Sequence, residues 1–325
     1  KNGFSPDACS KFRYRRKRKP GLCFPDQSGD KVMAVSSTTT TKEQEQQEKK
    51  VSVDFFHIDM IPNAMRKMGW EMAPKLMEHW FSIFPAYSFN KESKTELLNC
   101  DARSIPPSKV NDNIVKMAWA NQYPQVKNGI NELRSTWHTI NSRKILKKHI
   151  SKLDISEGET IKFGFSDDVK ELDATAQANF LIIGDKFDTI NDWYGAIGNC
   201  NLKVCVRGTV NLLNDILTLT IESLGFYIKD TYDFLDNHKF GIDIPESLGI
   251  WGKERILNKV ETLSYMSSYG SGAFGLLVEI FPGFVPVFNS DFRKWQKKHN
   301  TGGDYIVFSD LLWLPPLDKD RLVIL

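Results

Sequence analysis

The chain has 325 residues, of which 41% are hydrophobic and 26% are charged. This composition is that of an ordinary globular protein, and it excludes a wholly disordered chain, a collagen and a small disulfide-rich scaffold. The formal net charge of +3 is uneven, because residues 1–50 carry a local excess of +6 and the rest of the chain sums to −3. A nucleic-acid partner would depend on the basic segment alone, and the acidic remainder argues against such a partner.

Residues 1–50 are predicted to be a disordered basic and polar tail. Lys11–Lys19 is strongly basic, and Ser36–Lys50 contains no apolar residue whose burial could offset the entropy of ordering. The five cysteines are scattered and odd in number, which suits a chain made in a reducing cytoplasm and predicts no disulfide framework. No apolar run of about 18 residues is present, so the sequence predicts no transmembrane helix.

Residues 51–155 are predicted to form a helical region. Apolar residues recur at steps of three and four over residues 61–83, which indicates an amphipathic helix that bends near Gly69 and Pro74. Its methionines suit either an adaptable binding face or an ordinary core. A second helix is predicted over residues 123–150, where apolar residues keep the same spacing.

Residues 156–325 are predicted to form an antiparallel sheet with one or two helices, so the expected fold class is α+β. The apolar pattern switches to alternation, which is typical of strands. Residues 202–228 are predicted to form a hairpin with Asn214 and Asp215 at its tip. At Ser223 the apolar side of the second strand changes phase, and this slip predicts a β-bulge.

Three further elements are predicted after the hairpin. Residues 254–268 have helical spacing, and residues 273–280 and 305–312 are predicted to be strands. Gly270, Gly272 and Gly275 match GxGxxG, but a predicted helix precedes them and a predicted strand follows. That order is the reverse of the one that a dinucleotide-binding site needs.

A polar cluster follows the second strand of the hairpin. Asp230, Tyr232, Asp233 and His238 lie within nine residues. Two carboxylates and a histidine at the end of a strand are the groups needed to hold a divalent cation and to transfer a proton. The same residues also fit a polar loop whose aspartates cap turns.

The cluster resembles the signature of colicin M-type toxin domains, in which hairpin strands lead into Asp-x-Tyr-Asp and a His-Arg pair follows. Asp230, Tyr232 and Asp233 match, His238 falls near the expected place, and Lys239 replaces the arginine. The resemblance covers about residues 200–310. It implies a Mg²⁺-dependent hydrolase that cleaves lipid II, the lipid-linked peptidoglycan precursor, at the phosphoester between isoprenoid and pyrophosphate.

The resemblance also implies a role for each matched residue. Asp233 is then the acid/base or metal-linked carboxylate, and Asp230 supports the Mg²⁺ ion or a bound water, so these two are the expected metal ligands. Tyr232 positions phosphate, and His238 is a proton donor or base. Lys239 offsets phosphate charge as a point charge, because lysine lacks the bidentate fork of arginine.

A substrate with a lipid tail requires an apolar surface near the site. Residues 273–288 are the most apolar stretch of the chain, so we expect a peripheral membrane contact at Phe281–Phe284. A core strand and its loop also fit this stretch.

A broader resemblance joins residues 61–70 with residues 225–234, and it is to an uncharacterised proteobacterial domain family associated with type VI secretion. It implies a secreted effector or an accessory of the secretion machinery. Together with the colicin M-type resemblance, it predicts an antibacterial effector that is made in the bacterial cytoplasm, secreted, and active in the periplasm of the target cell. The expected partners are an immunity protein and a secretion spike protein. The alternative is a non-enzymatic adaptor or cargo protein of the secretion machinery, in which the aspartate cluster is purely structural.

Overall fold

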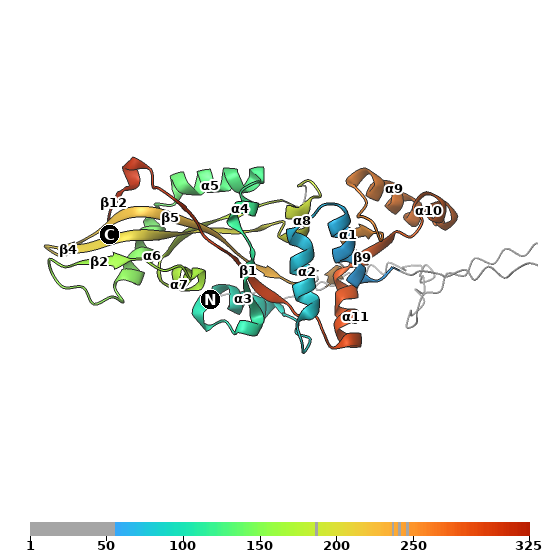
Figure 1. Ribbon diagram of the computed structural model, residues 1–325, viewed down its shortest axis with the longest axis horizontal. Helices are drawn as coiled ribbons and strands as arrows, with labels where there is room; N and C mark the ends of the chain where they lie inside the picture. Colours follow the sequence, from blue (N-terminus) through green and yellow to red (C-terminus); the bar gives the residue numbers. More distant parts are fainter. Residues whose placement is uncertain (1–55, 186–187, 236, 240–241, 245–246) are drawn as a thin grey trace, which may run out of the picture. The chain divides into compact units, whose positions relative to one another are not determined.

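The computed structural model describes residues 56–185, 188–235, 237–239, 242–244 and 247–325, with only the backbone described over residues 237–239 and 242–244. The predicted tail, residues 1–50, lies outside these ranges. The described residues belong to one unit in which helices pack around a mainly antiparallel sheet (Figure 1), so the predicted α+β class is confirmed.

Helices and strands alternate along the described chain. The helices are α1 (Ile61–Lys67), α2 (Met72–Ser82), α3 (Lys91–Asn99), α4 (Met117–Ala120), α5 (Pro124–Thr136), α6 (Ile140–Ile150), α7 (Val169–Thr175), α8 (Asp192–Ala196), α9 (Lys259–Gly270), α10 (Phe274–Ile280) and α11 (Asn289–His299). The strands are β1 (Val110–Val115), β2 (Thr160–Phe163), β3 (Gln177–Ile183), β4 (Cys200–Leu213), β5 (Ile216–Tyr232), β6 (Asn237–Lys239), β7 (Ile242–Ile244), β8 (Ser247–Trp251), β9 (Val285–Phe288), β10 (Tyr305–Ser309), β11 (Leu312–Leu314) and β12 (Leu322–Ile324).

The sheet is built on the long hairpin of β4 and β5, as the sequence predicts. The two turn residues, Asn214 and Asp215, both have positive φ. Asparagine and aspartate tolerate this conformation better than other residues with a side chain, and it matches the twist of a two-residue hairpin. β10 lies between β5 and β1, antiparallel to β5 and parallel to β1, while β2 and β3 pair with β4. The sheet therefore joins segments from both halves of the chain.

The predicted bulge lies in β5. Arg207 pairs with Ser223 and Gly208 pairs with Ile221, so Glu222 is an extra residue. Apolar residues on both sides of the bulge are buried: Leu219, Ile221, Leu224, Phe226 and Ile228, with Leu217 half-buried. The phase slip in the sequence is therefore the mark of a bulge that keeps one apolar face on the core.

Gly208→Ala is expected to lower the free energy of unfolding by about 2–3 kcal/mol. A Cβ atom at Gly208 would lie 2.0 Å from the backbone oxygen of Thr220, so the paired strands would have to separate. Urea denaturation measures the change. Gly275→Ala is the control, because its Cβ meets nothing within 4 Å and α10 tolerates alanine. Equal unfolding free energies for the two variants would contradict this packing constraint.

The predicted helix over residues 61–83 is two helices, because Gly69 has a φ of 78° and ends the first. α2 then begins with a cap that comes from another part of the chain. The Asp192 carboxylate accepts hydrogen bonds from the backbone N–H groups of Met72, at 2.9 Å, and Ala73, at 2.7 Å. The indole N–H of Trp119 also donates to it, at 3.0 Å. A capping aspartate so distant in sequence gives no local signal.

The C-terminal half is richer in helix than predicted, since it contains α7 to α11 in its described part. The expected strand over residues 273–280 is wrong, because this segment is α10. A short apolar run fits a buried strand and a helix equally well, so its period cannot decide between them. Of the GxGxxG glycines, Gly270 ends α9, Gly272 lies in the turn and Gly275 lies in α10, which is no dinucleotide-binding arrangement.

The membrane contact at Phe281–Phe284 stays a prediction, and the packing of these two rings favours the alternative of a core segment. Phe281 is buried against Tyr265, with ring centroids 5.7 Å apart, and Phe284 is half-buried beside the Arg255 guanidinium. Phe281 belongs to a small satellite core that also contains Leu277, and the partly buried Phe284 packs against that core.

Candidate functional site

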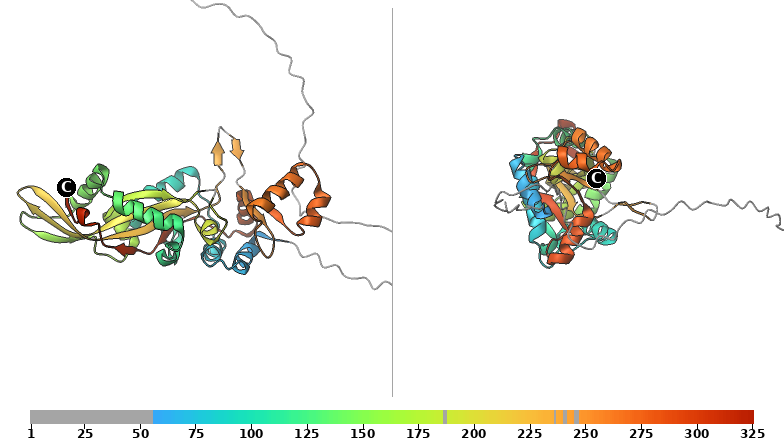
Figure 2. Two further views of the ribbon diagram at one scale, coloured as in Figure 1. Left: turned by 90° about the horizontal axis from the view of Figure 1, so that it is seen from above. Right: turned by 90° about the vertical axis from the view of Figure 1, so that its right-hand side faces the viewer.

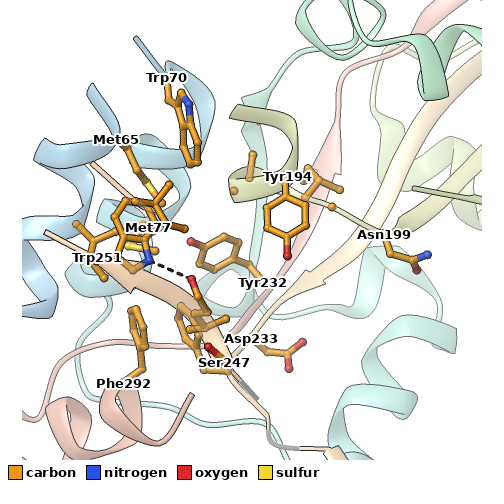
Figure 3. Close-up of a pocket in the computed structure, with 18 of the residues that line it drawn as sticks. Met65, Trp70, Met77, Tyr194, Asn199, Tyr232, Asp233, Ser247, Trp251 and Phe292 are labelled. Carbon is orange, nitrogen blue, oxygen red and sulfur yellow. Dashed lines mark hydrogen bonds between the residues drawn. The ribbon is translucent and has the colours of Figure 1, made fainter. Parts of the chain in front are cut away.

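A cavity of about 330 Å³ lies beside the end of β5. Four consecutive residues at this strand end, Thr231 to Phe234, line it, and they include two of the three matched Asp-x-Tyr-Asp residues. The opposite walls come from α1, α2, α8, β8 and α11 (Figure 3). Its apolar lining is rich in aromatic and sulfur side chains, namely Ile61, Met65, Trp70, Met77, Trp251, Ile256 and Phe292.

Tyr232 places a neutral phenol at this cavity. Its ring stacks on Tyr305 of β10, with centroids 5.4 Å apart, and burial raises the pKa of Tyr232. Within the described part of the chain its hydroxyl makes no hydrogen bond, so it can donate to or accept from a bound molecule. Tyr232 can therefore bind a polar group of a ligand without carrying a charge.

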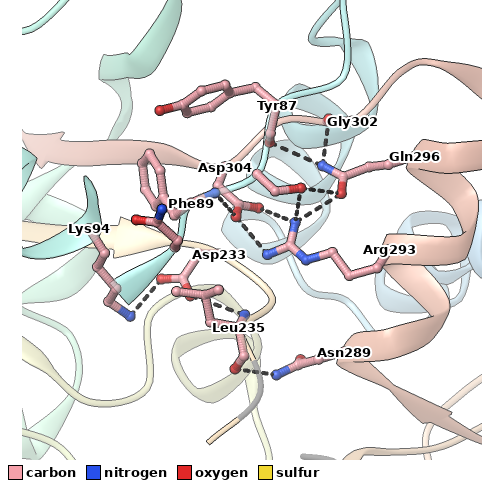
Figure 4. Close-up of polar contacts among 12 residues, drawn as sticks. Tyr87, Phe89, Lys94, Asp233, Leu235, Asn289, Arg293, Gln296, Gly302 and Asp304 are labelled. Carbon is pink, nitrogen blue, oxygen red and sulfur yellow. Dashed lines mark hydrogen bonds and ion pairs between the residues drawn. The ribbon is translucent and has the colours of Figure 1, made fainter. Parts of the chain in front are cut away.

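Asp233 follows the last residue of β5 and lines the same cavity. Its side chain is only 6% exposed. One carboxylate oxygen lies 2.7 Å from the Lys94 ammonium, and the other accepts the Leu235 backbone N–H at 3.2 Å (Figure 4). The Asn289 amide donates to the Leu235 carbonyl at 2.8 Å, which ties this turn to α11. Asp233 thus caps a turn, as the simpler interpretation predicts, and also presents a carboxylate beside the cavity.

Asp230 is a half-buried residue of β5, and its carboxylate accepts the Thr231 backbone N–H at 2.8 Å. Burial raises the pKa of Asp230 to about 7, despite the opposing effects of the Thr231 amide and the Lys94 ammonium. Asp230 does not line the cavity itself. A carboxyl group with this pKa exchanges protons near neutral pH, as an acid–base group must.

The fit of these residues to a Mg²⁺ ion is incomplete. Lys94 occupies the position beside Asp233 where a cation would bind, and no three His, Cys, Asp or Glu side chains among the described residues are grouped to hold a metal. β6, which contains His238 and Lys239, pairs with β7 in a hairpin that projects from the sheet (Figure 2). The side chains of His238 and Lys239 lie outside the described residues. The Mg²⁺ site therefore stays a prediction, with Asp230 and Asp233 as its described candidate ligands.

The wall behind the cavity is held by a second carboxylate. Buried Asp304 accepts the Phe89 backbone N–H at 2.8 Å and pairs with the Arg293 guanidinium at 2.6 Å (Figure 4). It also accepts the Trp80 indole N–H at 2.9 Å. Trp80 in turn contacts Phe292 edge to face, with ring centroids 5.3 Å apart. This network fixes α11 against α2, so the apolar wall is preformed.

A separate buried charge cluster lies on the other face of β5. Asp173 of α7 is bonded by Lys203 and Lys229, the latter at 2.7 Å, and accepts the Tyr227 hydroxyl at 2.6 Å. Lys229 and Asp230 are adjacent in the strand, so their side chains point to opposite faces. This cluster is therefore distinct from the cavity and ties α7 to the sheet.

The sequence predicts the site residues at the end of β5, Tyr232 and Asp233, but it gives no signal for the residues of the other walls. Lys94 has no signal, because it is one of many surface-type lysines until the fold brings it to Asp233. Met65 belongs to the methionine stripe for which a binding face and a core are both open, and it is buried and also lines the cavity. Met77, which lies outside that stripe, lines the cavity as well. Trp251 and Phe292 come from segments that only the folded chain brings together.

Comparison with known proteins gives a family but no named relative. The family described as "Family of unknown function (DUF6402)" matches residues 56–324, which include the sheet and every residue that lines the cavity. No curated protein and no solved structure matches the chain. The extent of the family match shows that the chain belongs to the DUF6402 family.

Proposed function

We propose that the protein is an antibacterial effector that binds an amphipathic substrate in this cavity and hydrolyses it, and that the substrate is lipid II. The observation that supports this proposal is that Thr231–Phe234, at the end of the Asp-x-Tyr-Asp segment, forms one wall of an apolar cavity. Small-molecule sites of this kind combine an apolar lining with a few polar groups that fix orientation, and their volumes begin at about 300 Å³. The apolar walls would take the first isoprene units, with the phosphoester beside Asp233.

The proposed reaction is addition of water to phosphorus. The bond between phosphorus and the isoprenoid oxygen breaks, the isoprenoid alcohol takes a proton, and the other product keeps its pyrophosphoryl group. Asp233 is placed to accept the proton of the attacking water, and the Lys94 ammonium beside it offsets phosphate charge. Asp230 can store or return a proton near neutral pH. Mg²⁺, which the resemblance implies, would supply further charge neutralisation.

The setting of this activity is proposed from the sequence resemblances. The protein would be made in the cytoplasm of one bacterium, loaded on a secretion spike protein and delivered to the periplasm of another. An immunity protein would protect the producing cell. The substrate fits this setting, because lipid II is a membrane-bound precursor that an apolar cavity can engage.

Purified wild-type protein is expected to release the pyrophosphoryl product from lipid II in detergent micelles when Mg²⁺ is present. Ser247→Trp should reduce kcat/KM at least about tenfold, since Ser247 is an exposed residue that lines the cavity and tryptophan would fill part of it. Ser151→Trp is the matched control, because Ser151 is exposed at the end of α6. Intact lipid II after incubation with the wild type would overturn the proposal.

A non-enzymatic adaptor or cargo protein is the second candidate, and one observation favours it. Both carboxylate oxygens of Asp233 already have partners, Lys94 and Leu235, so the residue has a sufficient structural role. In that case the wild type should bind a spike protein of the secretion machinery and leave lipid II unchanged.

A further inference from the structure

α9 and α10 form a helical hairpin inserted between strands β8 and β9, and they pack side by side beyond the sheet (Figures 1 and 2). Their inner faces are covered, because Tyr265, Leu277 and Phe281 form a small core between them. Away from this core the two helices expose eight large apolar side chains: Val260 (77%), Leu263 (72%), Met266 (47%), Tyr269 (47%), Phe274 (53%), Leu276 (46%), Val278 (50%) and Ile280 (51%). A patch of this kind on a soluble protein marks a surface that another phase or molecule covers.

The arrangement of these side chains on α10 indicates what covers them. Phe274 and Val278 lie on one side of the helix, whereas Leu276 and Ile280 lie on the opposite side, since each residue turns the helix by about 100°. All four are about half exposed. A helix that is apolar nearly all round is stable only when it is surrounded. One flat protein face would cover one side of α10, whereas a fluid apolar phase covers both.

The small number of charged residues in the helical hairpin also favours a lipid phase. Between residues 259 and 280 the charged residues are Lys259, Glu261 and Glu279. Glu261 is paired with Arg255 at the base of α9, where the nitrogen–oxygen distance is 2.7 Å. The exposed surface thus lacks the lysine and arginine clusters that attract anionic lipid headgroups. We therefore expect the hairpin to bind a membrane through its apolar side chains and not through charge.

We propose that α9 and α10 insert their exposed side chains into the interfacial region of a lipid bilayer and hold the protein on the membrane surface. The contact is peripheral, since no helix in the described part of the chain is long and apolar enough to span a membrane. The hairpin is continuous with the cavity, because Trp251 and Ile256 line the cavity and lead directly into α9. This inference goes beyond the hydrolase proposal and stands without it.

Flotation with electrically neutral phosphatidylcholine vesicles tests the inference. The wild type is expected to float with the vesicles, with little dependence on salt or on added anionic lipid. Leu263→Asp and Val278→Asp should each weaken binding at least about tenfold, because each replaces an exposed apolar group that the bilayer would bury with a charge. Ile182→Asp is the matched control: Ile182 is 61% exposed on β3, outside the hairpin, and its change should leave binding unaltered.

Several outcomes would overturn the inference. Failure of the wild type to float would do so, as would equal loss in the Ile182→Asp control or binding that requires anionic lipid and disappears in salt. A dimer in sedimentation experiments that Leu263→Asp dissociates would assign the hairpin to a second copy of the chain instead. Circular dichroism of each variant checks that the fold is intact. Cleavage of lipid II in micelles needs no bilayer, so the two proposals fail independently.

Discussion

Asp233→Asn is expected to lower turnover of lipid II by about 10²–10⁴-fold while the protein stays folded. The change removes the carboxylate charge and almost no volume, and Asp233 is the matched acidic residue that lines the cavity. The loss of its ion pair should lower the unfolding free energy by only about 1 kcal/mol, because the Lys94 side chain is 35% exposed and can be rehydrated. Initial rates with purified lipid II, together with urea denaturation, measure both effects.

The matched control for this variant is Asp318→Asn. Asp318 also forms an ion pair, with Arg321, but its side chain is 94% exposed. Asp318 is not one of the residues that line the cavity. It should leave both rate and stability within error. Wild-type rates for Asp233→Asn would show that the carboxylate serves only to cap the turn after β5.

Asp230→Asn is expected to stabilise the protein at pH 8 by about 2–4 kcal/mol. Asp230 has a pKa of about 7 in the folded protein, above the ordinary value of 3.8. The native state therefore holds the proton more tightly than the unfolded state does. The contribution of the protonated Asp230 carboxyl to the free energy of unfolding is fully present below about pH 4. It is lost as the pH rises towards 7. Asparagine cannot ionise, so the variant avoids this loss.

Urea denaturation of wild type and Asp230→Asn at pH 4 and pH 8 tests this expectation. The two proteins should agree within about 1 kcal/mol at pH 4 and diverge at pH 8, so other titrating groups cancel in the difference. A wild type as stable as the variant at pH 8 would show that the Asp230 carboxylate is well solvated. A residue that costs stability at neutral pH is typical of a site kept for chemistry, and the variant should also lose activity.

The sequence predicts the hairpin at the centre of the fold in some detail. Alternating apolar residues, the Asn214–Asp215 turn and the phase change at Ser223 all lie within one short segment, so local pattern was sufficient. The helix boundaries were harder, because α2 starts where Asp192 caps it from a distant segment. A signal that depends on tertiary contact cannot be seen in a local window.

The site also consists of residues that the sequence predicts and residues that only folding brings together. Asp230, Tyr232 and Asp233 are close in sequence, and their spacing was enough to single them out. The cavity beside them is formed by side chains from α1, α2, α8, β8 and α11, whose proximity is a property of the packed chain. The Lys94 partner of Asp233, which changes the electrostatics of the site, also comes from packing.

The apolar stretch over residues 273–288 shows a different limit. Its hydrophobicity correctly marks the stretch as unusual. Residues 273–280 were wrongly predicted to be a strand, and a membrane contact was predicted at Phe281–Phe284, where one ring is buried and the other half-buried. Which side chains of α9 and α10 are buried depends on which side of each helix faces the small core of Tyr265, Leu277 and Phe281, and the partner helix determines that.

The position of β10 has a consequence for how the protein is made. β10 is the strand that joins β1 to β5, and it is built from Tyr305–Ser309, close to the end of the chain. Its pairings bring together residues as far apart in sequence as Val110 and Ile306. Contacts of such long range close late and slowly. During synthesis all the residues from β1 to β10 must therefore leave the ribosome before the sheet can close, and until then the unpaired strands stay accessible to chaperones.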